Sequence, residues 1–480
     1  MSNARRYRGR PLSVGRAPAL RVLHVAQPSD GGSLVCAAHL VVDQIARGWT
    51  VGVATQSNLL SRTAEDHGAN YFAWTALRRP GFSVLEESHR LSRIVACFAP
   101  DVLHLHAAKA GLCGRLAVRG RRATLYQPHG WSFYAADGLL KQAALKWERF
   151  ATRWSASTIC VSEDERRSGQ AAGIRGRWTV IPNGVDTGRW RPPSSAERAQ
   201  ARRDLGVPQD ATLAVTVARL HRAKGVDVLL RAWSELHLHA PSARLIVVGV
   251  GPEMAKLMRA RPGGVTLAGA TDPRQCLAAA DVFVAPSRWE AGASLAVMEA
   301  MAQGLPVVAT QVDGMAAILE RRYLAPVDDP RALARILEEL LGDEHQRHVT
   351  GARNRDRVHA ERNLEACLEC TAELTLQVER RHSTRDRRFR TGFKSRGAFG
   401  GLESPAVWLS GAITGGRAIG GRPTTRPAAT LGPRKEPREP RGIAGADPGS
   451  RKGSNRIFEP GSTPTRFEPP DHERSFCWYV

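Results

Sequence analysis

The sequence is poor in the features that assign a chain to several common classes. No apolar run approaches the roughly 18–20 residues that a membrane-spanning helix needs. The basic segment 1–19 contains no apolar stretch of the kind that a secretory signal requires. The 8 cysteines are scattered along the chain, which favours reduced thiols over a disulfide framework. We therefore expect a cytoplasmic protein that does not cross a bilayer.

Aromatic residues are also scarce, at 6% of the chain, whereas basic residues give a formal net charge of +23. A basic surface suits nucleic acid, anionic lipid or phosphorylated substrates, and charge by itself does not choose among them. Nucleic-acid-binding proteins usually gather their positive charge in a recognition motif. Here the charge is diffuse, so we expect no specific nucleic-acid partner, although a nucleic-acid-binding protein stays an alternative.

Most of the chain alternates short apolar runs with amphipathic segments, which predicts an α/β architecture. Two such series are separated near residue 190 by a break rich in Arg, Pro and Ser. We expect two Rossmann-like, doubly wound domains whose strand ends face a central cleft. The expected parts are a basic extension (1–19), a first domain (20–190), a linker (191–204), a second domain (205–365), a C-terminal helix (366–384) and a Gly- and Pro-rich disordered tail (385–480).

Individual strands follow from the apolar runs. In the first domain they are expected near 20–26, 51–55, 102–106, 123–127, 158–162 and 178–182. In the second domain they are expected near 213–217, 245–248, 265–267, 282–285 and 306–310.

The most informative stretch runs from residue 285 to residue 310. It reads as a strand end, a loop of small residues, a helix, a glycine and a second strand, with Glu290 before the loop and Glu299 inside the helix. Such a loop offers backbone N–H groups and the positive end of a helix dipole to a phosphate. The two carboxylates can hold sugar hydroxyls. This combination suits a nucleotide-sugar; the plainer alternative is a buried α/β segment with two surface acids.

This stretch resembles the donor-site signature of retaining glycosyltransferases of family 4, which have the GT-B fold. The resemblance covers roughly residues 20–380, with several motifs in the family's order. The family usually has seven residues between the two Glu and this chain has eight, the additional one at 291–293. The segment after Thr310 is also shorter than is usual. The resemblance implies that Glu299 holds ribose hydroxyls and Glu290 holds the transferred sugar. It also implies that the following backbone approaches sugar and phosphate at Ala291, Gly292, Ser294 and Leu295.

Other residues of the second domain fit a diphosphate. Arg219 and Lys224 lie in a loop that follows a strand, where two cations can converge on one diphosphate. The resemblance implies that they neutralise the leaving nucleoside diphosphate. The turn that contains Gly251 resembles the family's turn beneath the nucleotide base, and a glycine there permits close backbone approach. The alternatives are two solvated surface cations and a purely structural turn.

The first domain contributes further candidates. Gly31 and Gly32 precede a helix after the first strand and can form a second anion-binding loop, which in the family lies over the donor phosphate and the acceptor. His129 ends a strand, and the resemblance implies a catalytic contact to the donor sugar near the reacting carbon. We place Lys109 on the acceptor side. A plain tight turn and a histidine satisfied by backbone groups are the alternatives.

We expect no catalytic metal and no cofactor. His104 and His106 alternate on one strand with no third ligand nearby, which disfavours a metal site. The chain also has no Asp-x-Asp motif, which the metal-dependent glycosyltransferase architecture uses. Arg219, Lys224 and helix N-termini can do the electrostatic work that a divalent metal does there. A nucleoside diphosphate sugar is then a co-substrate.

We therefore predict a retaining, hexosyl-type glycosyltransferase that moves a sugar from a nucleoside diphosphate sugar to a hydroxyl of a sugar, lipid-linked or small-molecule acceptor. Cell-surface polysaccharide or glycolipid synthesis is the expected setting, and a nucleotide-sugar 2-epimerase is the alternative enzyme. Residues 139–154 mix basic and aromatic side chains and can contact the inner face of an anionic membrane. An ordinary amphipathic helix packed on the sheet is the favoured alternative.

Overall fold

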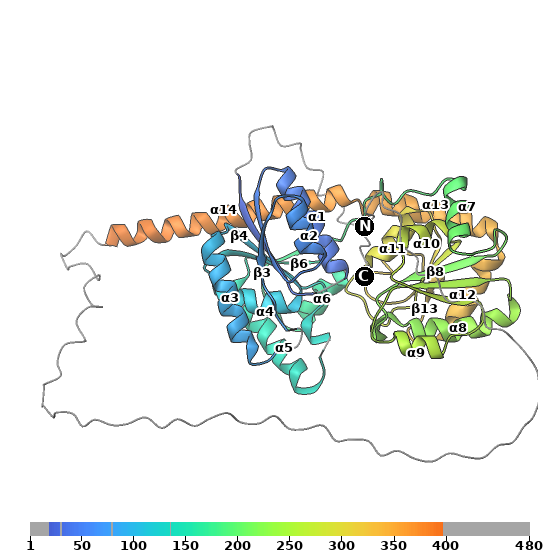
Figure 1. Cartoon of the computed structure of the whole chain (residues 1–480). Coiled ribbons are helices and arrows are strands. Elements are labelled where there is room, and N and C mark those ends of the chain that lie inside the picture. The colour runs from blue at the N-terminus through green and yellow to red at the C-terminus, as the bar shows by residue number, and fades with distance from the viewer. Residues whose placement is uncertain (1–18, 29–30, 78–79, 135, 397–480) are drawn as a thin grey trace, which may run out of the picture. The chain divides into compact units, whose positions relative to one another are not determined.

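The computed structural model describes residues 19–28, 31–77, 80–134 and 136–396, with side chains as far as residue 384. These residues form two parallel sheets that carry helices on both faces, which confirms the predicted doubly wound α/β architecture (Figure 1). No described helix is long and apolar enough to span a membrane.

The first sheet has seven strands in the order β3-β2-β1-β4-β5-β6-β7. Its strands are β1 (Arg21–Ala26), β2 (Thr50–Thr55), β3 (Asn70–Ala73), β4 (Val102–His106), β5 (Ala123–Gln127), β6 (Ser157–Cys160) and β7 (Trp178–Val180). The connecting helices are α1 (Gly32–Ala46), α2 (Leu59–Asp66), α3 (Ser83–Phe98), α4 (Ala107–Val118), α5 (Gly138–Ala151) and α6 (Glu163–Ala171). Successive side chains of a strand face opposite sides, so Val22 packs with α1 whereas Leu23 packs with α3 and α4.

The second sheet has six strands in the order β10-β9-β8-β11-β12-β13. They are β8 (Leu213–Val217), β9 (Arg244–Val248), β10 (Val265–Gly269), β11 (Val282–Ala285), β12 (Val307–Thr310) and β13 (Leu324–Ala325). The helices are α7 (Ser195–Asp204), α8 (Val226–His239), α9 (Met254–Arg259), α10 (Pro273–Ala279), α11 (Leu295–Ala302), α12 (Pro330–Gly342) and α13 (Glu344–Glu361). This order matches that of the first six strands of the first sheet.

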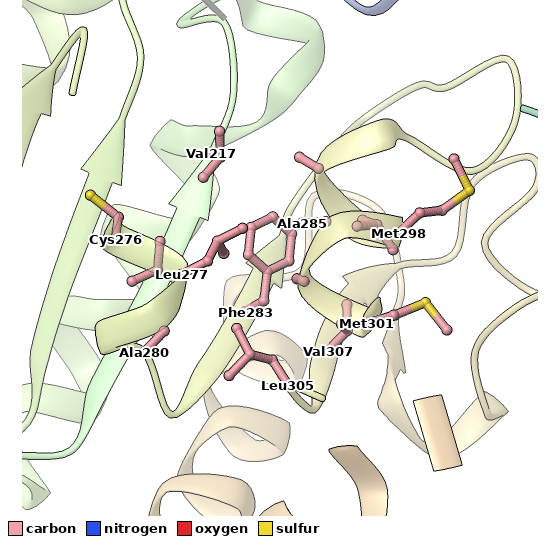
Figure 2. Packing of buried hydrophobic residues seen from close by; sticks show 14 of the residues in the cluster. Val217, Cys276, Leu277, Ala280, Phe283, Ala285, Met298, Met301, Leu305 and Val307 are labelled. Carbon is pink, nitrogen blue, oxygen red and sulfur yellow. The ribbon is translucent and has the colours of Figure 1, made fainter. Parts of the chain in front are cut away.

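Helix α11 is buried over its whole length, and this burial fixes where the preceding loop ends. Figure 2 shows Phe283 of β11 between Leu277 of α10 and the methionines Met298 and Met301 of α11. All four side chains are fully buried. The loop between β11 and α11 is therefore held at both ends by the core of the second sheet.

Several boundaries differ from the sequence-based expectation. The strands β3 and β13 were not predicted, because each is short and only two to four residues long. The segment 191–204 is not simply a linker, because α7 forms there and Arg198 and Arg202 pair with Asp281 after α10. Helix α14 (Leu364–Arg396) continues beyond residue 384, where the C-terminal helix was expected to end. The rest of the predicted tail and residues 1–18 lie outside the described residues.

Helix α14 packs on the first sheet although it follows the second sheet in the chain. Its residues Ala372, Leu374 and Val378 join the cluster that contains Val22 and Val102. Just before α14, Asn363 forms an isolated parallel β-bridge with Val185, which follows the last strand of the first sheet. The C-terminal helix is therefore part of the first core, which the sequence pattern did not indicate.

Candidate functional site

The predicted donor-binding residues lie on two loops that leave neighbouring strands of the second sheet. One loop follows β8 and carries Arg219 and Lys224; the other follows β11 and carries Glu290. The strand order reverses between β8 and β11, because β9 continues on one side and β12 on the other. In doubly wound sheets this switch point, at the carboxyl ends of the strands, is where ligands bind.

Arg288 ties these two loops together. Its guanidinium donates two hydrogen bonds to the carboxylate of Asp227, at 2.6 and 2.8 Å, and a third to Asp328 at 2.6 Å. Its guanidinium also donates to the carbonyl of Arg222 at 2.8 Å, and the backbone N–H of Arg288 donates to the carbonyl of Ala223 at 2.7 Å. The hydrogen bonds from Arg288 lower the pKa of Asp227. The loop after β11 is therefore held against the turn Arg222–Lys224.

The close approach of the two loops also requires a glycine. Gly225 has a φ of +62°, and a Cβ added there would lie 1.9 Å from the carbonyl oxygen of Pro286. No side chain fits at that distance. Gly225 therefore allows Lys224, the preceding residue, to lie beside the loop that carries Glu290.

Lys224 and Glu290, which the sequence analysis assigned to phosphate and sugar, form an ion pair. The Nζ of Lys224 lies 2.5 Å from Oε1 of Glu290, and the Ser287 hydroxyl donates to the same oxygen at 2.7 Å. The Glu290 side chain is 11% exposed and that of Lys224 is 29% exposed. Both charges are thus compensated, and the lysine is the more exposed partner of the pair.

Gly251 supports the loop of Arg219 from the other side. The turn after β9 pairs with this loop through the Ala218 N–H to Val248 and the Leu220 N–H to Val250, at 3.0 and 2.9 Å. A Cβ on Gly251 would lie 2.4 Å from the carbonyl oxygen of Leu220. The residue is therefore required for close backbone packing beside Arg219, which is partly buried.

The small-residue loop ends at Ser294, which caps α11 by accepting a hydrogen bond from the Val297 N–H at 3.3 Å. Leu295 begins the helix, and Glu299 is a buried residue of the same helix, 4% exposed. Glu299 lies near Arg189, whose pKa it raises, although burial outweighs this effect and leaves the Arg189 pKa lowered. The predicted order of loop, helix N-terminus and carboxylate is therefore present.

Residues of the first sheet lie against this loop. The Ser162 hydroxyl donates to the carbonyl of Ala291 at 2.6 Å, and a Cβ on Gly292 would lie 3.2 Å from Val161. Gly31, with a φ of +101°, precedes α1, and the next residue, Gly32, lies beside the Leu295 side chain. The two glycines and the loop at 291–295, predicted separately, are therefore brought together.

His129 has an uncommon backbone conformation, with a φ of +50°, at the end of β5. The following Gly130 lies against the ring of Trp289, because a Cβ there would be 2.3 Å from that ring. The Trp289 ring also lies near Tyr134, with centroids 5.9 Å apart. Trp289 directly precedes Glu290 and was not singled out by the sequence analysis. Its ring connects the loop that carries His129 with the loop that carries Glu290.

Glu165 of α6 is a second residue that the sequence analysis missed. Its two carboxylate oxygens accept the backbone N–H groups of Gly130 and Val161, at 2.6 and 2.7 Å. Burial raises its pKa to about 7, although these two hydrogen bonds oppose the shift. Ser162-x-x-Glu165 reads in the sequence as a helix-capping pair. The fold instead uses the carboxylate to hold the loops of His129 and Ser162.

Lys109 is not an open cation in the described structure. It is buried in α4, and its Nζ lies 2.7 Å from a carboxylate oxygen of Glu87, which is equally buried. Burial raises the pKa of Glu87, but hydrogen bonds from Lys109 and the Leu77 N–H outweigh burial and lower it. This pairing joins α4 to α3, and the acceptor-side role of Lys109 stays a prediction.

The histidines of the first sheet correct one expectation. His104 and His106 do have a third histidine nearby, because His24 of β1 pairs in register with His104 of β4. Ligand nitrogens of the three side chains lie within 4.8 Å of one another, and all three residues are fully buried. Pairing β1 with β4 in parallel register would have indicated His24 as this neighbour, because residues opposite each other on paired strands point to the same face of the sheet.

Comparison with known proteins agrees with the fold. Residues 30–189 match the family model described as "Glycosyltransferase Family 4", and residues 211–343 match the one described as "Glycosyl transferases group 1". The structure of Anabaena Alr3699/HepE, solved with UDP and glucose, superposes with a TM-score of 0.65. It is 21% identical and covers 74% of this chain and 99% of its own, so it shows the fold.

Two curated relatives are similar in sequence. The putative glycosyltransferase EpsD of Bacillus subtilis is 30% identical over 52% of this chain and 70% of its own length. The UDP-Gal:alpha-D-GlcNAc-diphosphoundecaprenol alpha-1,3-galactosyltransferase of Escherichia coli is 27% identical over 46% of this chain. The match spans 61% of the Escherichia coli protein, which is less than two thirds of its length.

The buried histidines predict a loss of stability in acid. Burial lowers the pKa of His24 and His129 to about 4 and places that of His104 and His106 well below the usual value of 6.5. Below pH 6.5 the unfolded chain therefore binds protons that the folded chain does not. Stability that is fully present above pH 6.5 should be lost as the pH falls towards 4, by about 1.4 kcal/mol per pH unit for each such group.

Urea unfolding at several pH values between about 4.5 and 8 measures this slope. Glu165 has a pKa that is raised from 4.5 to about 7, so between these pH values the folded chain binds a proton that the unfolded chain does not. Its contribution to the free energy of unfolding therefore grows as the pH falls and cancels the loss from one histidine. Replacing His104 with Leu should reduce the slope by one group. A free energy of unfolding that stays constant between pH 6.5 and 4.5 would contradict the prediction.

Proposed function

Because the chain belongs to the group 1 glycosyltransferases of family 4, we propose that it transfers a sugar from a nucleoside diphosphate sugar to an acceptor hydroxyl. The observation that carries this proposal is the pairing of a cationic loop with a carboxylate loop at the switch point of the second sheet. Lys224 and Glu290 are joined there by a 2.5 Å ion pair. Phosphate and sugar hydroxyls need these two kinds of partner side by side.

The second sheet would bind the donor. Arg219 and Lys224 would take the diphosphate, and backbone N–H groups near Ser294 and Leu295 at the start of α11 would add to the positive potential. Glu299 would hold the ribose hydroxyls and Glu290 the hydroxyls of the transferred sugar. Gly251 would let the nucleoside approach the backbone beside Arg219.

The first sheet would bring the acceptor. Gly31, Gly32 and His129 lie on loops that the structure places beside Leu295 and Trp289. His129 would contact the transferred sugar near its anomeric carbon, and the acceptor oxygen would be aligned with that carbon. We assign no enzymic nucleophile. Retention would follow if the acceptor oxygen attacks the face that the diphosphate leaves, with the leaving phosphate accepting the acceptor proton.

The Lys224–Glu290 pair suggests how the site is kept ready before a donor binds. Without a diphosphate, the carboxylate of Glu290 balances the lysine and holds it near the phosphate position. With a donor, Lys224 can turn its charge to the diphosphate, while Glu290 exchanges the lysine for sugar hydroxyls. The leaving group gains negative charge in the transition state, so the lysine contact strengthens as the reaction proceeds.

A lipid-linked acceptor is the class we favour. The Escherichia coli relative carries such an acceptor in its name. A nucleotide-sugar 2-epimerase is less well supported, because it needs free carboxylates for acid and base catalysis. The additional buried carboxylate near His129, that of Glu165, has both oxygens engaged by backbone N–H groups. A screen of UDP-glucose, UDP-galactose, UDP-N-acetylglucosamine and GDP-mannose for thermal stabilisation and hydrolysis tests the donor class. Stabilisation by oligonucleotides alone would contradict the proposal.

The cationic loop gives the first prediction. Arg219→Ala and Lys224→Ala should each weaken binding of the free nucleoside diphosphate, because a hydrogen bond to a charged group contributes about 1.5–3 kcal/mol. Isothermal titration calorimetry with UDP and GDP measures the loss. Arg222→Ala is the matched control, since Arg222 is an exposed cation of the same turn. Unchanged diphosphate affinity in both variants would remove the two residues from the site.

The two carboxylates give the second prediction. Glu299→Gln should weaken both the donor and the free diphosphate, because Glu299 is assigned to the nucleoside. Glu290→Gln should leave diphosphate affinity unchanged or raise it, because Lys224 loses its partner, and should mainly lower kcat. Calorimetry with the free diphosphate and steady-state kinetics with the donor found in the screen separate the two roles. Equal loss of diphosphate affinity in both variants would show the assignment to be wrong.

We propose that helix α5 contacts an anionic membrane with its exposed face, while Ala144 and Leu145 pack on the core of the first sheet, as expected of an amphipathic helix. Only Glu148 and Ala151 of this helix are buried. Leu139 is 89% exposed, and Leu140 and Phe150 are exposed as well. Exposed basic residues lie on the same helix and the turn that follows it: Lys141, Lys146, Arg149 and Arg153. Apolar and basic side chains together bind the headgroup region of anionic bilayers.

Co-sedimentation with phosphatidylglycerol vesicles tests this contact, with phosphatidylcholine vesicles beside them. Binding should be selective for phosphatidylglycerol, should weaken as salt is added, and should be lost in Leu139→Asp. Leu238→Asp is the control, because Leu238 is 80% exposed on α8 of the other sheet. Equal binding of the two variants would place any membrane contact elsewhere.

A further inference from the structure

Behind His129, a row of hydrogen-bonded side chains runs into the core of the first sheet. The Nε2 of His129 lies 3.3 Å from Nδ1 of His106, and Nε2 of His106 lies 3.0 Å from Nδ1 of His24. The Nε2 of His24 lies 2.9 Å from the amide oxygen of Gln44 in α1. The row therefore begins at the residue proposed to contact the sugar and ends at a buried amide.

These groups are unusual for their place in the fold. His24, His106 and Gln44 of α1 are fully buried, and the two histidines share their sheet face with apolar residues such as Val22 and Val102. Burial keeps the rings neutral, because it lowers the pKa of all three histidines in the row. Polar side chains in such a place reduce stability unless each hydrogen bond is made. An apolar residue at 24 or 106 would pack there without that requirement.

The direction of the hydrogen bonds follows from neutral rings. A neutral imidazole donates from one nitrogen and accepts at the other. The oxygen of Gln44 accepts, so His24 carries its proton on Nε2 and accepts at Nδ1. His106 must then donate from Nε2 and accept at Nδ1. His129 therefore donates from Nε2, and its Nδ1 is left with a lone pair.

We propose that His24 and His106 are positioning residues that fix the tautomer of His129, so that its Nδ1 accepts a hydrogen bond from a hydroxyl of the transferred sugar. This inference rests on the proposed transfer reaction for its sugar, but the tautomer itself does not. A fixed tautomer matters because a ring with the proton on Nδ1 would present a donor where the sugar hydroxyl needs an acceptor. The hydrogen bond between His106 and His129 sets the position of the His129 proton.

A metal ion held by His24, His104 and His106 is the competing interpretation. The structure argues against it in two ways. The nitrogens of His24 and His106 that face each other are 3.0 Å apart and share one proton, which leaves no room for an ion between them. The rings also lie nearly parallel, with angles of 18–34° between the three planes, so they do not converge on one point.

His104 provides a matched control. It is as buried as His24 and His106, and its ring stacks on His106 with centroids 4.2 Å apart. It faces Gln127 and lies outside the row of hydrogen bonds. His104→Leu therefore removes a buried imidazole of the same sheet face without breaking the row. His106→Leu breaks the row, whereas His106→Asn keeps an acceptor near the position of Nδ1.

The first experiment is ¹⁵N NMR of histidine side chains in the full chain, with His129 assigned by its loss in His129→Gln. We expect a single tautomer with the proton on Nε2. That tautomer should persist in His104→Leu and His106→Asn and become mixed in His106→Leu. Mixed tautomers in the unchanged chain, or an unaffected His129 in His106→Leu, would overturn the proposal. So would zinc that purifies with the chain in equal amount and is lost in His104→Leu.

The second experiment measures turnover with the donor found in the screen. His106→Leu and His24→Leu should lower kcat about 10–100-fold with little change in KM, the size of effect seen when a supporting residue behind a functional histidine is removed. His106→Asn should recover part of the loss, and His104→Leu should have kcat close to that of the unchanged chain. Equal losses in His104→Leu and His106→Leu would show a packing effect only. The NMR result uses no donor, so its failure is distinguishable from failure of the proposed reaction.

Discussion

The pairing of Arg288 with Asp227 is the interaction on which the second-sheet site depends. The loops after β8 and β11 leave neighbouring strands at the point where the strand order reverses, so no sheet ladder continues between them. A guanidinium can hold a carboxylate with two N–H groups and still reach a backbone carbonyl, which a lysine cannot do. Once Arg288 has joined the loops, Gly225 lets the backbone of Pro286 approach. Lys224 and Glu290 then lie within bonding distance.

The first sheet depends on a different constraint, the buried carboxylate of Glu165. It is held by two backbone N–H groups from separate loops, and it keeps the segments that carry His129 and Ser162 together. Ser162 reaches the carbonyl of Ala291, and Trp289 covers Gly130. Through these contacts the residues proposed for the sugar and the acceptor lie beside the donor loop. Both sheets thus use buried or half-buried charge to place loops rather than to strengthen a core.

The histidine row shows why a polar interior can be kept despite its energetic disadvantage. Each imidazole in the row satisfies its neighbour, so the group is stable only as a complete set. Such a set fixes which ring nitrogen carries the proton as well as where each ring lies. Apolar side chains would pack the same space, but they would leave the proton of His129 free to occupy either nitrogen. The pattern is therefore easier to explain by the state of His129 than by the stability of the sheet.

The sequence by itself determined the two doubly wound sheets and the order of the motifs, because strand runs and helix faces are local patterns of residue type. It also indicated Arg219, Lys224, Glu290 and Glu299 as candidates, whose roles stay predictions. Only the tertiary structure decided which charges meet: Lys224 with Glu290, Lys109 with Glu87, and Glu165 with backbone. It also decided the third histidine and the place of α14 on the first sheet. These contacts join residues far apart in the chain, and strand register and loop packing, which bring them together, leave no local signature in the residues themselves.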